Sequence, residues 1–239
     1  DFADNPVNPD WTPQRTERDR VLQTHSTDQP EAHAISADMR ELADSYGARL
    51  LVGEVFLPND QRARWYGTAE RPQVHLPFNF QLTETAWHAG TLARVIADYE
   101  ASLPAHGWPN WVIGSHDARR IAARIGEAQA RVAAMLLLTL RGTPTLYQGD
   151  ELGIGHVPIP SDRIRDPLQL RQPHIDIGRD PSRTPMPWDG SRFAGFSTAE
   201  PWLPLNTDWR TRNVAAQHAV PHGCDPMQTA KINTVKAST

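Results

Sequence analysis

The first regular pattern of apolar positions along the chain is helical. Ile35, Met39, Leu42 and Tyr46 recur at spacings of four, three and four residues, which places them on one face of a helix. The residues between them are mostly polar or small. The pattern therefore predicts a helix over residues 31–46 with a single apolar face.

Short apolar stretches alternate with helical ones over the next hundred residues. These stretches are rich in β-branched and aromatic residues, which favours strands, and the predicted strands are 50–56, 74–80, 111–115 and 143–148. Helical patterns follow at 85–103 and 127–140, and the second is so continuously apolar that we expect burial on several sides. Strands and helices in this order predict βα units and a parallel sheet, the α/β class.

The alternation stops near residue 150. Residues 151–217 are punctuated by proline and glycine throughout, and an irregular segment of this length is usually functional or disordered. Its tryptophan and phenylalanine residues argue against disorder, since disordered segments are poor in aromatics. We therefore divide the chain into a βα region (1–150), an irregular region (151–217) and a tail (218–239).

Composition excludes several functional classes. The chain has 239 residues, and its 24 basic and 28 acidic side chains give a net charge of −4, which does not suggest a nucleic-acid partner or a polybasic membrane anchor. The longest apolar run, near 133–140, is too short to span a membrane. One cysteine excludes an intramolecular disulfide framework. No leader-like pattern opens the chain, so we expect a cytoplasmic protein.

The tail differs from the rest in its basic residues. Of the 24 basic residues 22 are arginine, and both lysines, Lys231 and Lys236, lie in the tail together with the sole cysteine, Cys224. Two interpretations stay open: a disordered terminus, or foreign sequence such as the product of a frameshift. We favour the second, because the preference for arginine lapses there.

Two carboxylates stand where parallel strands are expected to end. Glu54 lies within the apolar stretch 50–56, which predicts a partly desolvated carboxyl group suited to a general acid. Asp117 closes the third strand, at the end where βα folds hold their active sites. A buried Glu–Arg ion pair explains Glu54 equally well, and a helix N-cap explains Asp117. Together, however, two carboxylates are what cleavage of a glycosidic bond requires.

Other chemistries have weaker support. His116 forms no metal-ligand spacing with His106 or His156, so we expect no metal. The run Ser115-His116-Asp117 is not a catalytic triad, because triad members meet in space and not in sequence. The chain has no glycine-rich phosphate loop, and we expect no cofactor.

Four strings, taken in order, carry a resemblance: GEVFLP, NWVIGSHD, GTPTLYQGDELG and GRDPSRTPMPWDG. They are similar to family 13 glycoside hydrolases, the α-amylase superfamily, and most similar to its α-glucosidase and oligo-1,6-glucosidase branch. The resemblance extends over about residues 1–217. It implies a partial (β/α)₈ TIM barrel containing strands five to eight, with the irregular region leading toward a C-terminal β-domain.

The resemblance assigns roles to five residues. Glu54 matches the general acid/base of the family, and Asp117 matches the acidic residue that holds sugar hydroxyls and stabilises the oxocarbenium-like state. His116 matches the histidine that hydrogen-bonds the sugar. Arg120 takes the place of an arginine near the sugar, although Arg119 replaces the usual proline before it, and Phe78 is expected to line the pocket or to be a core aromatic.

The family nucleophile, an aspartate on strand four, has no match in this chain. Because the retaining mechanism needs that group, we expect a fragment of an α-glucosidase acting on α-linked glucosides or small oligosaccharides that is inactive alone. Two alternatives stay open. One is a transglycosylating relative such as trehalose synthase or sucrose isomerase, and the other is a non-catalytic interaction homologue.

Overall fold

Four short parallel strands form the centre of the molecule. The computed structural model describes residues 3–219, and β1 (Val52–Gly53) pairs with β2 (Leu76–Pro77) while β3 (Asn110–Val112) pairs with β4 (Thr143–Thr145). A parallel bridge between Asn79 and Trp111 joins the two pairs. The strands run in chain order and do not close into a barrel within the described residues.

β1, β2 and β4 lie inside the predicted stretches and β3 starts one residue before its stretch, and all four strands are shorter than predicted. The reason is visible at β2, where Pro77 has no backbone N–H to donate to a longer ladder. Backbone hydrogen bonds nevertheless extend the alignment, since Phe78 N–H donates to Gly53 O at 2.8 Å and Asn79 N–H donates to Asn110 O at 2.9 Å. The ends of the strands are therefore held in register.

The three long predicted helices are present, with several short ones between them. The long helices are α1 (Pro30–Ser45), α4 (Ala89–Ser102) and α6 (Glu127–Thr139). The short helices of the βα region are η1 (Glu17–Arg20), α2 (Asn59–Arg64), α3 (Gln81–Glu84) and α5 (Ile121–Ile125). The prediction for 85–103 started too early, because His88 is extended and the helix begins at Ala89.

The hydrophobic core lies between β3 and the helices α4, α5 and α6. Tyr99 and Trp111 are fully buried there, with their rings edge to face at a centroid distance of 5.1 Å, and Leu137 of α6 packs against the same cluster. Helix α6 is not buried on several sides as predicted. Ala130, Ala133 and Ala134 face the core, whereas Val132 and Met135 are about half exposed, so it is an ordinary amphipathic helix.

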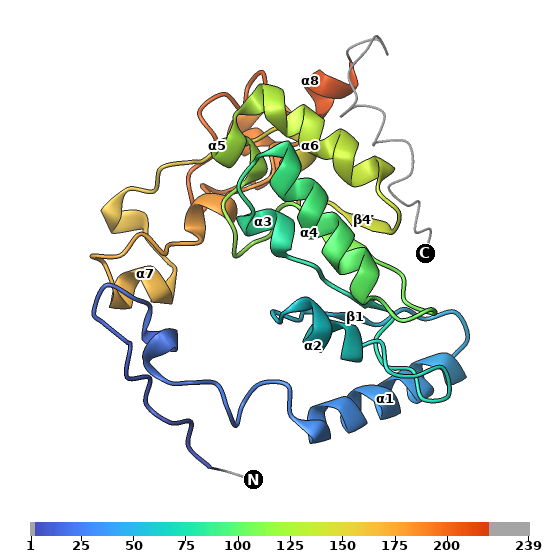
Figure 1. Cartoon of the computed structure of the whole chain (residues 1–239). Helices are drawn as coiled ribbons and strands as arrows, with labels where there is room; N and C mark the ends of the chain where they lie inside the picture. The colour runs from blue at the N-terminus through green and yellow to red at the C-terminus, as the bar shows by residue number, and fades with distance from the viewer. Residues whose placement is uncertain (1–2, 220–239) are drawn as a thin grey trace.

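Helix α1 lies at the lower edge of the molecule, away from α4 and α6 (Figure 1). The helix itself is as predicted, but its apolar face is open. Ile35, Met39, Leu42 and Tyr46 are between 54 % and 69 % exposed. This face has no partner among residues 3–219.

The irregular region contains only short helical turns. They are η2 (Asp150–Leu152), η3 (Ser161–Arg163), α7 (Pro167–Arg171), η4 (Asp180–Ser182), η5 (Arg192–Gly195) and α8 (Val214–His218). Buried polar side chains hold it in place, with Asp166 accepting the backbone N–H of Leu168 and of Arg179. The early chain packs beside α7 (Figure 1), where Gln172 Oε1 accepts the Glu17 N–H at 2.9 Å.

Two expectations concern the ends of the molecule and its surface. The tail predicted at 218–239 lies outside the described residues, apart from His218, which ends α8, and Ala219. Among residues 3–219, no helix is both long enough and apolar enough to cross a membrane.

Candidate active site

Glu54 is the residue directly after β1. Its position is fixed by the strand pairing, since the flanking Gly53 carbonyl accepts the Phe78 N–H and Val55 is buried. The Glu54 side chain itself is exposed. The expectation that apolar neighbours desolvate it was wrong, because Val52 and Phe56, two residues before and after it, are themselves about half exposed.

His116 and Asp117 follow β3 in a tight turn. The Ser115 hydroxyl accepts the backbone N–H groups of Asp117 and Ala118, both at 3.1 Å. This turn directs the His116 and Asp117 side chains outward. His116 Nε2 lies 3.3 Å from Asp117 Oδ1. Serine at this position therefore shapes the loop.

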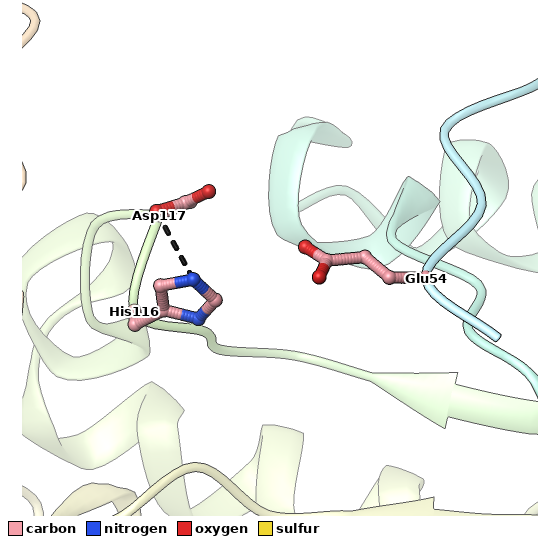
Figure 2. Close-up of side chains that lie close together, drawn as sticks. All are labelled: Glu54, His116 and Asp117. Carbon is pink, nitrogen blue, oxygen red and sulfur yellow. Dashed lines mark ion pairs between the residues drawn. The ribbon is translucent and has the colours of Figure 1, made fainter. Parts of the chain in front are cut away.

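The structure brings Glu54 to the His116–Asp117 pair. One ligand atom of each residue lies within 4.8 Å of the others, and the Glu54 carboxylate points toward the pair from the end of β1 (Figure 2). Two carboxylates and an imidazole at this separation could hold a cation or flank a sugar. Because the three side chains are exposed, a substrate can reach them.

Two arginines of the irregular region hold Asp117, and the sequence reasoning did not single them out. Arg183 Nη2 donates to Asp117 Oδ1 at 2.6 Å, and Arg183 Nε donates to the His116 carbonyl at 3.0 Å. Arg179 Nη1 reaches the same Asp117 oxygen at 3.2 Å. The spacing of four in GRDPSR was the available signal, but nothing in it named the partner.

Arg179 is itself anchored by a buried carboxylate. Asp166 accepts from Arg179 Nη2 at 2.7 Å and from Arg179 Nε at 2.9 Å. These hydrogen bonds raise the pKa of Arg179 and lower the pKa of Asp166 to about 2. The guanidinium thus stays charged and fixed while its remaining nitrogen contacts Asp117.

Arg120 does not face the open cluster. It is 1 % exposed, and its guanidinium donates to the Gln148 carbonyl at 2.6 Å and the Ser182 carbonyl at 2.9 Å. Burial lowers its pKa. In this structure Arg120 ties the end of β4 to the irregular region, which differs from the sugar contact that the family resemblance implies.

Phe78 is half-buried and packs against other aromatics. Its ring lies 5.4 Å from the ring of Phe80, which is stacked at 4.3 Å on Phe56. Of the two roles expected for Phe78, the structure shows this packing. The more exposed ring in the group is Phe56, two residues beyond Glu54.

Comparison with known proteins agrees with this geometry. The family model described as the catalytic domain of α-amylase matches residues 5–224. The chain belongs to this family, the family 13 glycoside hydrolases. The TIM-barrel fold class is that of its relatives, although the described residues form only part of such a barrel.

Several relatives show the range of functions within the family. The salivary alpha-glucosidase of Anopheles gambiae is 32% identical over 231 residues, covering 92% of this chain and 37% of that protein. The human amino acid transporter heavy chain SLC3A1 is 33% identical over 214 residues, covering 86% and 30%. The crystal structure of the alpha-glucosyl transfer enzyme XgtA superposes with a TM-score of 0.78 at 29% identity, covering 91% and 42%. The chain thus spans about two-fifths or less of the length of these relatives.

Proposed function

We propose that this chain carries the acid/base side of the active site of a retaining α-glucosidase. The observation that carries the proposal is the meeting of Glu54, at the end of β1, with His116 and Asp117, at the end of β3. In retaining enzymes one carboxyl group protonates the leaving oxygen and later accepts a proton from water. The chain's membership of a family that includes α-glucosidases supports the substrate class, α-linked glucosides of small sugars.

Each residue then has one part in the reaction. Glu54, exposed and not engaged by an arginine in any described contact, protonates the glycosidic oxygen. Arg179 and Arg183 fix Oδ1 of Asp117. Its other oxygen accepts hydrogen bonds from hydroxyl groups of the sugar, and its negative charge stabilises positive charge at the sugar carbon. His116 orients the same ring.

We further propose that β1 to β4 correspond to barrel strands five to eight and that the 239 residues alone do not turn over substrate. The cluster contains two carboxylates, and the role assigned to Asp117 is stabilisation and not attack. A covalent intermediate needs a further nucleophile. Cytoplasmic location is part of the same proposal.

Transfer to a sugar acceptor is the second candidate. Its support is the likeness to XgtA, an alpha-glucosyl transfer enzyme. Hydrolysis and transfer share the step that Glu54 catalyses and differ in whether water or a sugar attacks afterwards. A non-catalytic interaction role is less consistent with the assembled carboxylate pair.

A binding and turnover experiment on the purified chain tests the proposal. Maltose is titrated while the His116 and Asp117 amide signals are followed by NMR, and an aryl α-glucoside is assayed for release of the phenol. We expect maltose to shift both signals and to lose this effect in Asp117→Asn, with no phenol released. The control is Asp38→Asn, which removes an exposed carboxylate paired with Arg71.

Two results contradict the proposal. If maltose shifts neither amide signal, the cluster does not bind the sugar. Phenol release that Glu54→Gln abolishes shows that these residues already contain a complete catalytic centre.

A further inference from the structure

One buried carboxyl group behind the cluster has no partner. Asp150 follows β4 and is 1 % exposed, and neither of its side-chain oxygens accepts a hydrogen bond from a described residue. An ionised carboxylate without hydrogen bonds is costly in such a place. The group is therefore more stable in its protonated form, and burial raises the pKa of Asp150 to about 7.

Asp150 lies directly beneath the loop that carries the site. A Cβ placed on Gly114 would be 2.0 Å from Asp150 Oδ2, so the carboxyl group lies against the backbone of Gly114. Ser115, His116 and Asp117 follow immediately. A change in the charge or position of this carboxyl group therefore alters the surroundings of the Gly114 backbone, at the start of the loop.

Charged groups surround Asp150 unequally. Arg120 and Arg124, at the start and within α5, favour its ionised form, while Glu151 beside it in the chain opposes ionisation. Gly114, on the β3 side, brings no charge. Neither arginine forms an ion pair with Asp150 in the described structure, and the Arg120 Nε is also buried without a hydrogen-bond partner.

Short contacts connect Arg120 to the site. Arg120 donates to the Ser182 carbonyl, and the Ser182 hydroxyl donates to the Ala118 carbonyl at 2.7 Å. The next residue, Arg183, donates to Asp117. The hydrogen bond of Arg120 to the Ser182 carbonyl thus joins the loop after β3 to the segment that holds Asp117, and its bond to the Gln148 carbonyl joins that loop to the residues after β4.

We propose that Asp150 is a positioning residue whose proton keeps Arg120 on the carbonyls of Gln148 and Ser182, and so keeps Arg183 on Asp117. When the Asp150 O–H gives its proton to solvent, the new carboxylate attracts the free Arg120 Nε–H. Arg120 then leaves the Ser182 carbonyl, and the contact of Arg183 with Asp117 loosens. The site is assembled in the protonated state and relaxed in the ionised state. The link to catalysis rests on the proposed function, whereas the structural coupling does not.

NMR of the whole chain tests the coupling directly, without any activity assay. The Asp150 carboxyl carbon and the amides of Gly114 and Ala118 are followed from pH 5 to 9. We expect all three to titrate together with a midpoint near 7. In Asp150→Asn, which keeps the shape but cannot ionise, the two amides lose that titration.

His116 carries an imidazole in the same loop, so the experiment is run in a His116→Gln background. Arg120→Gln is the second variant, and it separates Asp150 from the loop: the Asp150 carbon still titrates, and the Ala118 amide no longer follows. A matched control is Asp166→Asn, a second buried aspartate whose low pKa excludes it from this range.

The proposal is overturned if the Asp150 carbon shows no titration between pH 5 and 9. It is equally overturned if the Ala118 amide titrates unchanged in Asp150→Asn or in Arg120→Gln. Should Asp150→Asn not fold, the carbon and amide titrations of the His116→Gln and Arg120→Gln proteins still decide. Loss of maltose binding with intact coupling would instead contradict only the proposed function.

Discussion

Helices α1 and α4 have similar amphipathic patterns and opposite surroundings. In α4, Leu92 is 7 % exposed and Tyr99 is fully buried against Trp111. In α1, Met39 and Leu42 occupy the equivalent apolar stripe and remain more than half exposed. The pattern of apolar positions therefore determines where a helix forms and which face is apolar, but burial of that face requires a partner element.

The difference separates two sources of stability in one chain. Around β3 the helices bury apolar area, which is the main favourable contribution to folding. Helix α1 makes polar contacts instead, among them the pair of Arg40 Nε with Asp44 Oδ2 at 2.8 Å, four residues apart. Such pairs contribute only about 0.3–0.5 kcal/mol each. We expect α1 to be the least stable helix of the βα region.

The largest effect is expected from Trp111→Ala in the core. The indole is fully buried, contacts Tyr99 edge to face, and donates from Nε1 to the Arg141 carbonyl at 2.8 Å. Loss of a buried tryptophan should lower the free energy of unfolding by about 3–5 kcal/mol. Urea unfolding followed by circular dichroism measures it. Met39→Ala on α1 is the control, with a change of about 0.5 kcal/mol or less; equal losses would show that the α1 face is covered in solution.

An intermediate effect is expected from Asp166→Asn, in the irregular region that has neither long helices nor strands. Its folded pKa of about 2 is below the unfolded value, so ionisation of Asp166 stabilises the fold above about pH 4 and stops doing so as the pH falls toward 2. The substitution should cost about 2 kcal/mol at pH 7. Unfolding curves at pH 7 and pH 3 measure this.

The pH dependence identifies the cause of that loss. The difference between the parent and Asp166→Asn should shrink at pH 3, while Asp38→Asn, from an exposed ion pair, should change stability by less than about 1 kcal/mol at either pH. A difference that stays constant with pH would point to packing and not to ionisation.

The smallest effect on stability is expected from Leu42→Ser. The side chain is 61 % exposed, and surface substitutions usually change the free energy of unfolding by no more than about 0.5 kcal/mol. Exposed apolar stripes also promote association. Light scattering while the protein is concentrated should therefore show less aggregation for Leu42→Ser than for the parent. Unchanged aggregation would mean that the exposed face of α1 does not mediate the association.

Much of the fold follows from the sequence because periodicity reports local geometry. The helices at 30–45 and 127–139 begin and end within one residue of the prediction. The strands were located correctly and predicted too long, since apolar character continues beyond the few residues that pair. The exposure of α1 could not be predicted, because it depends on which elements pack nearby.

The candidate site divides in the same way. Glu54 follows β1 and His116 and Asp117 follow β3, and the rule that functional groups gather at the ends of parallel strands made all three candidates, while their convergence is seen only in the structure. Arg183 and Arg179 come from a segment without periodicity more than sixty residues later, so no local signal linked them to Asp117. Arg120 was assigned by likeness to relatives, and only the structure shows its burial.

The contact between the early chain and α7 has a consequence for how the protein is made. The Glu17 N–H and Gln172 Oε1 that meet there are separated by 155 residues. At synthesis rates of about 5–20 residues per second, roughly ten to thirty seconds pass before the partner of Glu17 leaves the ribosome. During that interval the Glu17 N–H lacks the partner that Gln172 supplies, so this contact forms only late in synthesis.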